Sequence, residues 1–130
     1  MIKKIAFVGL PTTNLEASKN FYGEVLGIEL DHDYGDCWSE FKTPDGKAIA
    51  LDTMSPKMNP STSTYLALET DDLDTELARI KRLGGKIAKE AWDNKDAEGK
   101  VICRMAIVLD PAENAIMLHE IAPWRAAPAS

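Results

Sequence analysis

An internal repeat limits the folds open to this chain of 130 residues more than any other feature of its sequence. Residues 43–51, TPDGKAIAL, resemble residues 110–118, DPAENAIML, at an offset of 67 positions. Residues 14–27 also resemble residues 72–85, at an offset of 58 positions. Each segment has a polar cap, a helical pattern and a closing glycine. A repeat of this kind indicates one structural unit used twice. The polar stretch 92–100 accounts for the difference in offset and predicts a long hairpin loop.

Each copy predicts a strand, a helix and three further strands. The expected strands are residues 4–10, 28–34, 37–42 and 48–52 in the first copy, and 64–70, 87–92, 101–109 and 115–120 in the second. Thr13 or Asn14 can cap the first helix, which ends at Gly27. Its expected buried stripe is Leu15, Tyr22, Val25 and Leu26, and that of the second helix is Leu73, Leu77, Ile80 and Gly84.

The chain therefore predicts a single α+β domain. Its expected parts are residues 1–122 as the domain, with module one at 1–54, a linker rich in Pro, Ser and Asn at 55–63, module two at 64–122, and a tail at 123–130. The tail has no periodicity and is expected to fray, apart from Trp124, which can dock.

The composition indicates a soluble protein with no nucleic-acid or membrane partner. The net charge of -6 provides no basic stripe for a phosphate backbone, and no apolar run approaches the roughly 18 residues that span a bilayer. The first apolar segment is too short for a signal peptide, so a cytoplasmic location is expected. Cys37 and Cys103 lack a CxxC spacing and predict reduced, partly buried thiols, with a disulfide or a reactive thiol as the alternatives.

The repeat carries short motifs that resemble one family. Residues 14–22, NLEASKNFY, are followed by VLG at 25–27, and residues 71–74, DDLD, open the second helix. Together with Asp110 and Pro111 before the last strand, these motifs resemble the vicinal oxygen chelate superfamily over roughly residues 2–120. That group includes glyoxalases, extradiol dioxygenases, fosfomycin-resistance enzymes and bleomycin-resistance binding proteins. The resemblance implies two βαβββ modules whose mixed sheets curl around a shared cavity, with helices outside, in a homodimer. Whether one chain or two chains close that cavity stays open.

The resemblance also implies four metal-ligand positions. They fall on Phe7 and Tyr65 in the first strands and on Ala50 and Met117 in the last strands. None of these is the His, Gln or Glu that a catalytic divalent cation would need, because such ions take imidazole or hard oxygen donors. We therefore expect no metal and no other cofactor, and a cavity that favours an apolar or aromatic ligand.

The residues expected to contact that ligand are Phe7, Tyr65, Met117, His119, Trp38 and Arg104. Strand alternation places His119 on the face of Met117. The face of Trp38 stays open, so it is either a stacking platform or ordinary core. Arg104 lies within an apolar strand and needs a partner, either Glu69 or an anionic ligand.

The sequence thus favours a protein that sequesters a small, partly apolar or aromatic molecule without metal, as bleomycin-resistance proteins do. No catalytic residue is identified. One alternative is a glyoxalase-type lyase or dioxygenase with displaced ligands, in which His119 works with Glu69 or Glu120. A second alternative is a structural or regulatory dimer whose cavity is filled by its own side chains.

Overall fold

The computed structural model describes residues 1–59 and 61–125. The chain forms two compact units: the N-terminal unit comprises residues 7–65, and the C-terminal unit comprises residues 1–6 and 66–125. Each unit contains four neighbouring strands of a mixed sheet and at least one α-helix, so the fold is α+β as the sequence predicted. Among the helices that the structure describes, none combines the length and apolar character needed to cross a membrane.

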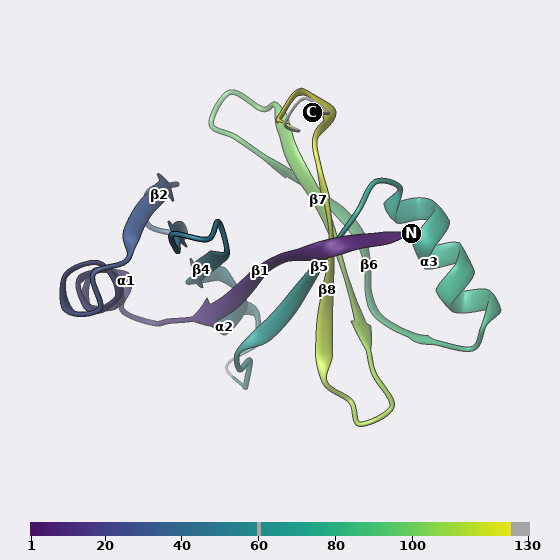
Figure 1. Ribbon diagram of the computed structural model, residues 1–130. Helices are drawn as coiled ribbons and strands as arrows, with labels where there is room; N and C mark the ends of the chain where they lie inside the picture. Colours follow the sequence, from purple (N-terminus) through teal and green to yellow (C-terminus); the bar gives the residue numbers. More distant parts are fainter. Residues whose placement is uncertain (60, 126–130) are drawn as a thin grey trace. The chain divides into compact units, whose positions relative to one another are not determined.

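The N-terminal unit is built on strands in the order β2-β3-β4-β1; Figure 1 labels β1, β2 and β4 of these. These strands are β1 (Ile2–Pro11), β2 (Glu29–Asp33), β3 (Trp38–Lys42) and β4 (Ala48–Asp52). β1 and β4 are parallel, and the other neighbours are antiparallel. The unit also contains helices α1 (Leu15–Asn20) and α2 (Met54–Met58). Leu15 of α1 packs with Phe41 and Leu51, so α1 covers one face of this sheet.

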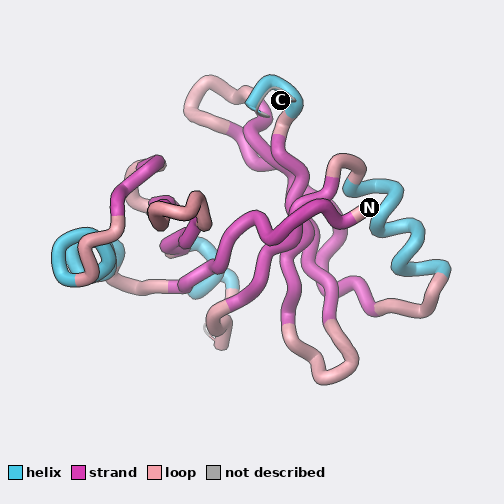
Figure 2. The backbone as a smooth tube through the Cα atoms, in the orientation of Figure 1, coloured by secondary structure: helices cyan, strands magenta, loops and turns pink. Residues whose placement is uncertain are grey.

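The C-terminal unit repeats this connectivity with strands in the order β5-β8-β7-β6. They are β5 (Tyr65–Thr70), β6 (Lys86–Lys95), β7 (Val101–Leu109) and β8 (Ala115–Ile121). β5 and β8 are parallel, and β7 is antiparallel to both of its neighbours. The turn that joins β7 and β8 lies at the bottom of Figure 2, and helix α3 (Leu73–Arg82) follows β5.

The apolar residues of helix α3 form part of the hydrophobic core of the C-terminal unit. Asp72 caps it by accepting a hydrogen bond from the Thr75 amide at 3.1 Å. Leu73 and Leu77 are buried against Ala106 of β7 and Leu118 of β8, with Ile80 packed beside them, as the helical spacing predicted. Gly84, expected on the same face, is exposed and has a φ of 85°, which favours glycine at a helix end.

The first helix differs from its prediction. The α-helix ends at Asn20, and residues Phe21–Val25 form a π-helical turn, in which the Leu26 amide bonds to the Phe21 carbonyl at 2.9 Å. A π turn advances each side chain by a smaller angle than an α turn does. Val25 and Leu26 therefore leave the predicted buried stripe and are 64% and 52% exposed.

Two expected connections contain more regular structure than their polar composition suggested. Residues 92–100 are not one long loop, because β6 continues to Lys95 in register with β7. The remaining turn is closed by the Asp96 carboxylate, which accepts hydrogen bonds from the amides of Glu98 and Lys100. Residues 55–63 include most of α2, with Pro60 outside the described residues.

The tail begins with a short 3-10 helix, Pro123–Arg125. Trp124 docks as expected, since its indole nitrogen donates to the Val101 carbonyl at 2.9 Å. The predicted fraying of residues 126–130 lies outside the described residues.

Candidate functional site

The N-terminal sheet has one face against α1 and one face that carries the candidate ligand contacts. Register pairs Ala50 with both Gly9 and Glu40, and pairs Asp52 with Trp38. Because side chains alternate along a strand, Trp38 lies on the face of Ala50, opposite the face that packs on α1. The register thus settles which face of the third strand carries Trp38.

Three aromatic rings gather on this face. The centroid of Phe7 lies 5.3 Å from that of Trp38 and 6.4 Å from that of Tyr65, with interplanar angles of 87° and 76°. Edge-to-face pairs of this kind stabilise by about 0.5–1.5 kcal/mol beyond area burial. The Trp38 indole nitrogen also donates to the Glu40 carboxylate at 2.9 Å. Phe7 and Tyr65 therefore lie together with Trp38, whose face the sequence left open. Contact of these rings with a ligand stays a prediction.

Gly9 and Asp52 hold the Tyr65 ring in place, a role that sequence reasoning did not identify. A Cβ atom at Gly9 would lie 2.1 Å from the Tyr65 ring, so only glycine leaves room for it. The Tyr65 hydroxyl donates to the buried Asp52 carboxylate at 2.8 Å. Burial, and then Asp52, raise the pKa of Tyr65 far above its ordinary value. Tyr65 is thus a neutral hydrogen-bond donor and not a phenolate ligand.

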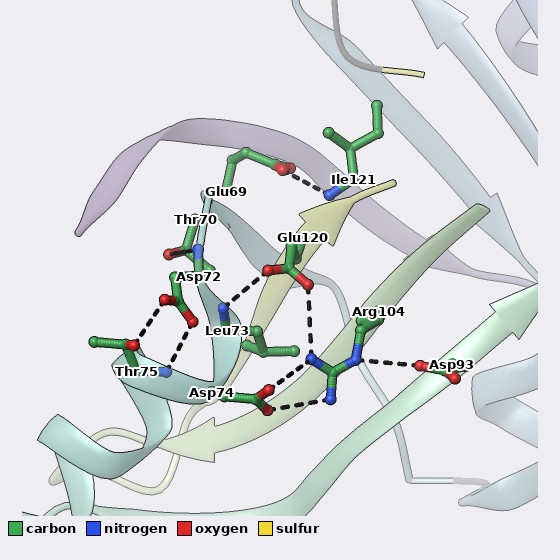
Figure 3. Close-up of polar contacts among 10 residues, drawn as sticks. All are labelled: Glu69, Thr70, Asp72, Leu73, Asp74, Thr75, Asp93, Arg104, Glu120 and Ile121. Carbon is green, nitrogen blue, oxygen red and sulfur yellow. Dashed lines mark hydrogen bonds and ion pairs between the residues drawn. The ribbon is translucent and has the colours of Figure 1, made fainter. Parts of the chain in front are cut away.

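On the C-terminal sheet, two buried titratable side chains face each other. Register pairs Glu69 of β5 with His119 of β8, and their carboxylate oxygen and Nδ1 atom are 2.6 Å apart. The other Glu69 oxygen accepts from the Ile121 amide at 2.9 Å, as Figure 3 shows. Met117 is also buried and lies two residues before His119, on the same face. Cys103 of β7 is a diagonal neighbour of His119 on the same face, because it pairs with Ile121 and Met105 pairs with His119.

The His119 imidazole is protonated at neutral pH. Burial alone lowers its pKa, but the neighbouring Cys103 and Glu69 outweigh this effect and raise the pKa from 6.5 to about 9. Sequence reasoning named His119 and Glu69 together, but it did not group Cys103 with them and expected there a reduced, partly buried thiol, with a disulfide or a reactive thiol as the alternatives. Strand alternation could have indicated this position. Cys103 and Arg104 are consecutive residues of β7, so Cys103 lies on the face opposite Arg104.

We expect stability to fall as the pH rises through about 9. A folded-state pKa above the unfolded value of about 6.5 stabilises the protein fully below that pH, and the contribution is lost as His119 deprotonates. The loss is on the order of 3 kcal/mol at most. Urea denaturation at several pH values measures it. His119→Gln should abolish most of the change in unfolding free energy with pH, whereas a variant at the exposed His32 should keep it. If His119→Gln shows the same pH dependence as the parent, His119 is not its cause.

Arg104 lies on the other face of β7, within a network of carboxylates (Figure 3). Its guanidinium donates to Asp74 at 3.2 Å and to Asp93 at 3.1 Å, and lies 3.7 Å from Glu120. Arg104 therefore has protein partners, as one of its two expectations held, but they are Asp74, Asp93 and Glu120 in place of Glu69. Glu120 also accepts from the Leu73 amide at 3.2 Å. Alternation turns Glu120 away from His119, so of these two glutamates it is Glu69 that bonds to the imidazole.

The four positions implied for metal ligands do not fit a metal. Phe7, Ala50, Tyr65 and Met117 are each at most 8% exposed. A phenyl ring and a methyl group offer no lone pair, the Tyr65 hydroxyl is neutral and engaged, and a thioether is a soft donor. No step that depends on a metal can be assigned to these residues.

Another group in the N-terminal unit has the composition of a cation site. One ligand atom each from Asp31, His32 and Glu40 lies within 4.8 Å of the others. Register places His32 opposite Glu40, and a β-bulge lies between Leu30 and His32. Sequence reasoning missed this group because the pairing of β2 with β3 brings it together. The residues are exposed or half-buried, and such acidic groups are common without a metal.

Comparisons with solved structures find the same fold. A chain described as the NAD-dependent benzaldehyde dehydrogenase from Legionella pneumophila superposes with a TM-score of 0.70 at 13% identity, covering 89% of this chain and 98% of that one. A glyoxalase/bleomycin resistance protein/dioxygenase superfamily member from Vibrio splendidus 12B01 gives 0.63 at 14% identity, with coverages of 92% and 99%. The Mn(II)-bound glyoxalase from Novosphingobium aromaticivorans gives 0.60 at 18% identity, with coverages of 95% and 44%. At these identities the likeness is one of fold.

Sequence comparison identifies the family. No curated protein matches the chain. Residues 4–118 match the family described as the Glyoxalase/Bleomycin resistance protein/Dioxygenase superfamily, in agreement with the motifs and the fold. The chain therefore belongs to the glyoxalase/bleomycin resistance protein/dioxygenase superfamily.

Proposed function

We propose that this protein binds a small aromatic molecule on the aromatic face of its N-terminal unit, with no metal at the four family positions. The observation that carries the proposal is the replacement of ligand side chains by rings: Phe7 and Tyr65 occupy two of those positions and pack with Trp38. In this proposal the protein sequesters its ligand and changes no bonds, as bleomycin-resistance proteins do.

The charges near the rings favour an aromatic amine. Glu40 is half-buried beside Trp38 and has one carboxylate oxygen bonded to the indole nitrogen, which leaves acceptor capacity for a ligand. Asp52 is fully buried and already occupied by Tyr65 and α2. A protonated amine on a planar ring would combine ring contacts with an ion pair to Glu40. The net charge of -6 also attracts cations over longer distances.

The metal content of the protein, purified without added ions, tests the first half of the proposal. We expect less than stoichiometric divalent metal by elemental analysis. If metal is found, a His32→Ala/Glu40→Gln variant shows whether it occupies the exposed Asp31, His32 and Glu40 group. Stoichiometric metal that persists in this variant would contradict the proposal.

Thermal shift against a panel of aromatic amines and neutral phenols tests the second half. A ligand that binds only the folded state raises the melting temperature by mass action, with about 2.7 kcal/mol of stabilisation at a concentration of 100 times Kd. We expect Trp38→Leu to remove the shift and Trp124→Leu, a change in the docked tail, to preserve it. A panel without any shift, or a shift that survives Trp38→Leu, contradicts binding at the aromatic face.

We also propose that the ligand-binding form is a homodimer, as the family resemblance implies. Size-exclusion chromatography with light scattering should then give twice the 14.3 kDa of one chain. A mass equal to that of one chain at the concentration used would contradict the dimer proposal. It would not affect the proposal that the protein binds a ligand.

A further inference from the structure

Three side chains with sulfur or nitrogen donor atoms lie together on one face of the C-terminal sheet. Met105 of β7 lies opposite His119 of β8, and Cys103 lies two residues before Met105. Side chains two residues apart on a strand share a face, so all three belong to the same face. Cys103, Met105 and His119 are 4%, 5% and 9% exposed, and Cys103 is a free cysteine. A thiol, a thioether and an imidazole therefore share one buried patch of the sheet.

The backbone hydrogen bonds place Met105 and His119 in the closer type of antiparallel pair. The Ala122 amide donates to the Ile102 carbonyl at 3.1 Å, so these two residues form a hydrogen-bonded pair. The two types of pair alternate along the ladder, and Met105 with His119 lies three positions further on. They are thus a non-hydrogen-bonded pair, with Cα atoms about 4.5 Å apart. Cys103 is a diagonal neighbour of His119, at roughly 7–8 Å, which keeps it within reach of the ring.

Glu69 orients the His119 ring from the other side of β8. The sheet order β5-β8-β7 puts Glu69 of β5 on one side of His119 and the two sulfur residues of β7 on the other. The Glu69 carboxylate lies 2.6 Å from Nδ1 and is itself held by the Ile121 amide at 2.9 Å, the contact drawn in Figure 3. With Nδ1 toward β5, Nε2 lies on the side of β7. A carboxylate on one ring nitrogen is the usual support of a histidine that binds metal through the other.

The donor set decides which class of cation suits this patch. Thiolate and thioether sulfurs are soft ligands that select Cu(I), whereas Mg²⁺, Ca²⁺ and Mn²⁺ prefer oxygen. Zn²⁺ sites are almost always four-coordinate, with thiolate, imidazole or carboxylate ligands. A set of three donors that includes a thioether does not match that preference. The patch therefore favours a soft monovalent cation.

Met117 lies on the same face but belongs to another part of it. It pairs with Ile107, whereas Cys103 pairs with Ile121, so Met117 and Cys103 are four ladder positions apart. At about 3.3 Å per residue this separation is roughly 13 Å along the strands. The short cysteine side chain keeps a bound ion on its own side of the Met105 and His119 pair. Met117 is thus a matched control and not a ligand.

We propose that Cys103, Met105 and His119 bind one Cu(I) ion, with Glu69 as the residue that positions the His119 ring. The ligand atoms are Sγ of Cys103, Sδ of Met105 and Nε2 of His119. Metals bind deprotonated ligands, so the ion displaces the thiol proton and any proton on Nε2, while the hydrogen on Nδ1 stays with Glu69. This function is separate from ligand binding at the aromatic face of the N-terminal unit.

Competition with the Cu(I) chelator bathocuproine disulfonate, on the full chain and without oxygen, tests the proposal. We expect one Cu(I) ion per chain. Met105→Leu conserves volume but removes the sulfur, so it should lower the affinity by at least about 10-fold, the smallest loss expected even for an outer-shell partner. Met117→Leu, the same change on the same face, should leave the affinity unchanged. Cys103→Ser should also abolish tight binding, whereas Cys37→Ser in the N-terminal unit should not.

A pair of variants tests the positioning role of Glu69. Glu69→Leu removes the acceptor from Nδ1 and should lower the Cu(I) affinity by about 10- to 100-fold. Glu69→Gln keeps an amide oxygen that can accept from Nδ1, so it should recover part of this loss. If Glu69→Gln binds Cu(I) as weakly as Glu69→Leu does, Glu69 does not position the ring.

X-ray absorption at the copper edge identifies the thioether ligand. In protein that carries selenomethionine, copper should have one selenium neighbour. Met105→Leu should remove this selenium signal, and Met117→Leu should keep it.

Three results would overturn the proposal. They are an unchanged Cu(I) affinity in Met105→Leu, an equal loss in Met117→Leu, and tighter binding of Zn²⁺ than of Cu(I) by the same residues. If Cys103→Ser fails to fold, Met105→Leu still decides the question, because it conserves volume. Copper is added in these tests, and its loss in Met105→Leu separates this site from metal at the four family positions. The Cu(I) proposal and the aromatic-face proposal can therefore fail separately.

Discussion

Gly9→Ala is expected to lower the free energy of unfolding by about 3 kcal/mol, because the added methyl group overlaps the Tyr65 ring. The new Cβ would lie 2.1–2.5 Å from three ring carbons. The ring cannot easily retreat, since its hydroxyl bonds to Asp52 and its edge packs on Phe7. Urea denaturation followed by circular dichroism measures the loss.

Gly23→Ala is the matched control for this prediction. A Cβ there would meet the Phe41 ring at 3.4 Å, an ordinary contact, so the change should stay within about 0.5 kcal/mol. In a Tyr65→Ala background, Gly9→Ala should cost less than about 1 kcal/mol, because the obstructing ring is gone. An undiminished cost in that background would show that Tyr65 is not the cause.

Asp52→Ala is expected to destabilise the protein by about 3 kcal/mol through lost hydrogen bonds. The Asp52 carboxylate accepts from the amides of Met54 and Ser55 at 2.8 and 3.0 Å, and from the Tyr65 hydroxyl at 2.8 Å. Loss of the amide contacts costs about 1 kcal/mol, as for a helix cap, and an unpaired buried hydroxyl costs about 1–3 kcal/mol. Chemical denaturation gives the total.

Two variants separate these contributions. Asp72→Ala removes an exposed cap on α3 with no buried hydroxyl attached, so it should cost about 1 kcal/mol. Tyr65→Phe, introduced into Asp52→Ala, should recover about 1–2 kcal/mol by removing the unpaired hydroxyl. If the double variant is no more stable than Asp52→Ala, the hydroxyl is not left unpaired.

Strand positions were predictable where the local pattern is strong. Residues 48–52 and 101–109 form strands with the predicted bounds, because both are apolar runs bordered by turn residues. The buried face of α3 also follows from spacing alone. The first helix did not follow its pattern, since a π turn after Asn20 depends on how the segment packs.

The partners of polar residues were less predictable. Arg104 takes its three carboxylates from α3, β6 and β8, three elements whose proximity no local pattern encodes. Glu69 was considered for Arg104 but pairs with His119, because alternation puts Arg104 on the other face of its strand.

By itself, the sequence determined the strand–helix–three-strand repeat and the family, and it places no His, Gln or Glu at Phe7, Ala50, Tyr65 and Met117, where the resemblance implies metal ligands. These features depend on residue type and local spacing, which the order of residues contains. Only the tertiary structure decided that Trp38 joins Phe7 and Tyr65, that His119 bonds to Glu69, and that Cys103 lies on their sheet face. Those groupings depend on the register between strands distant in sequence, and a shift of one residue would turn each side chain to the opposite face.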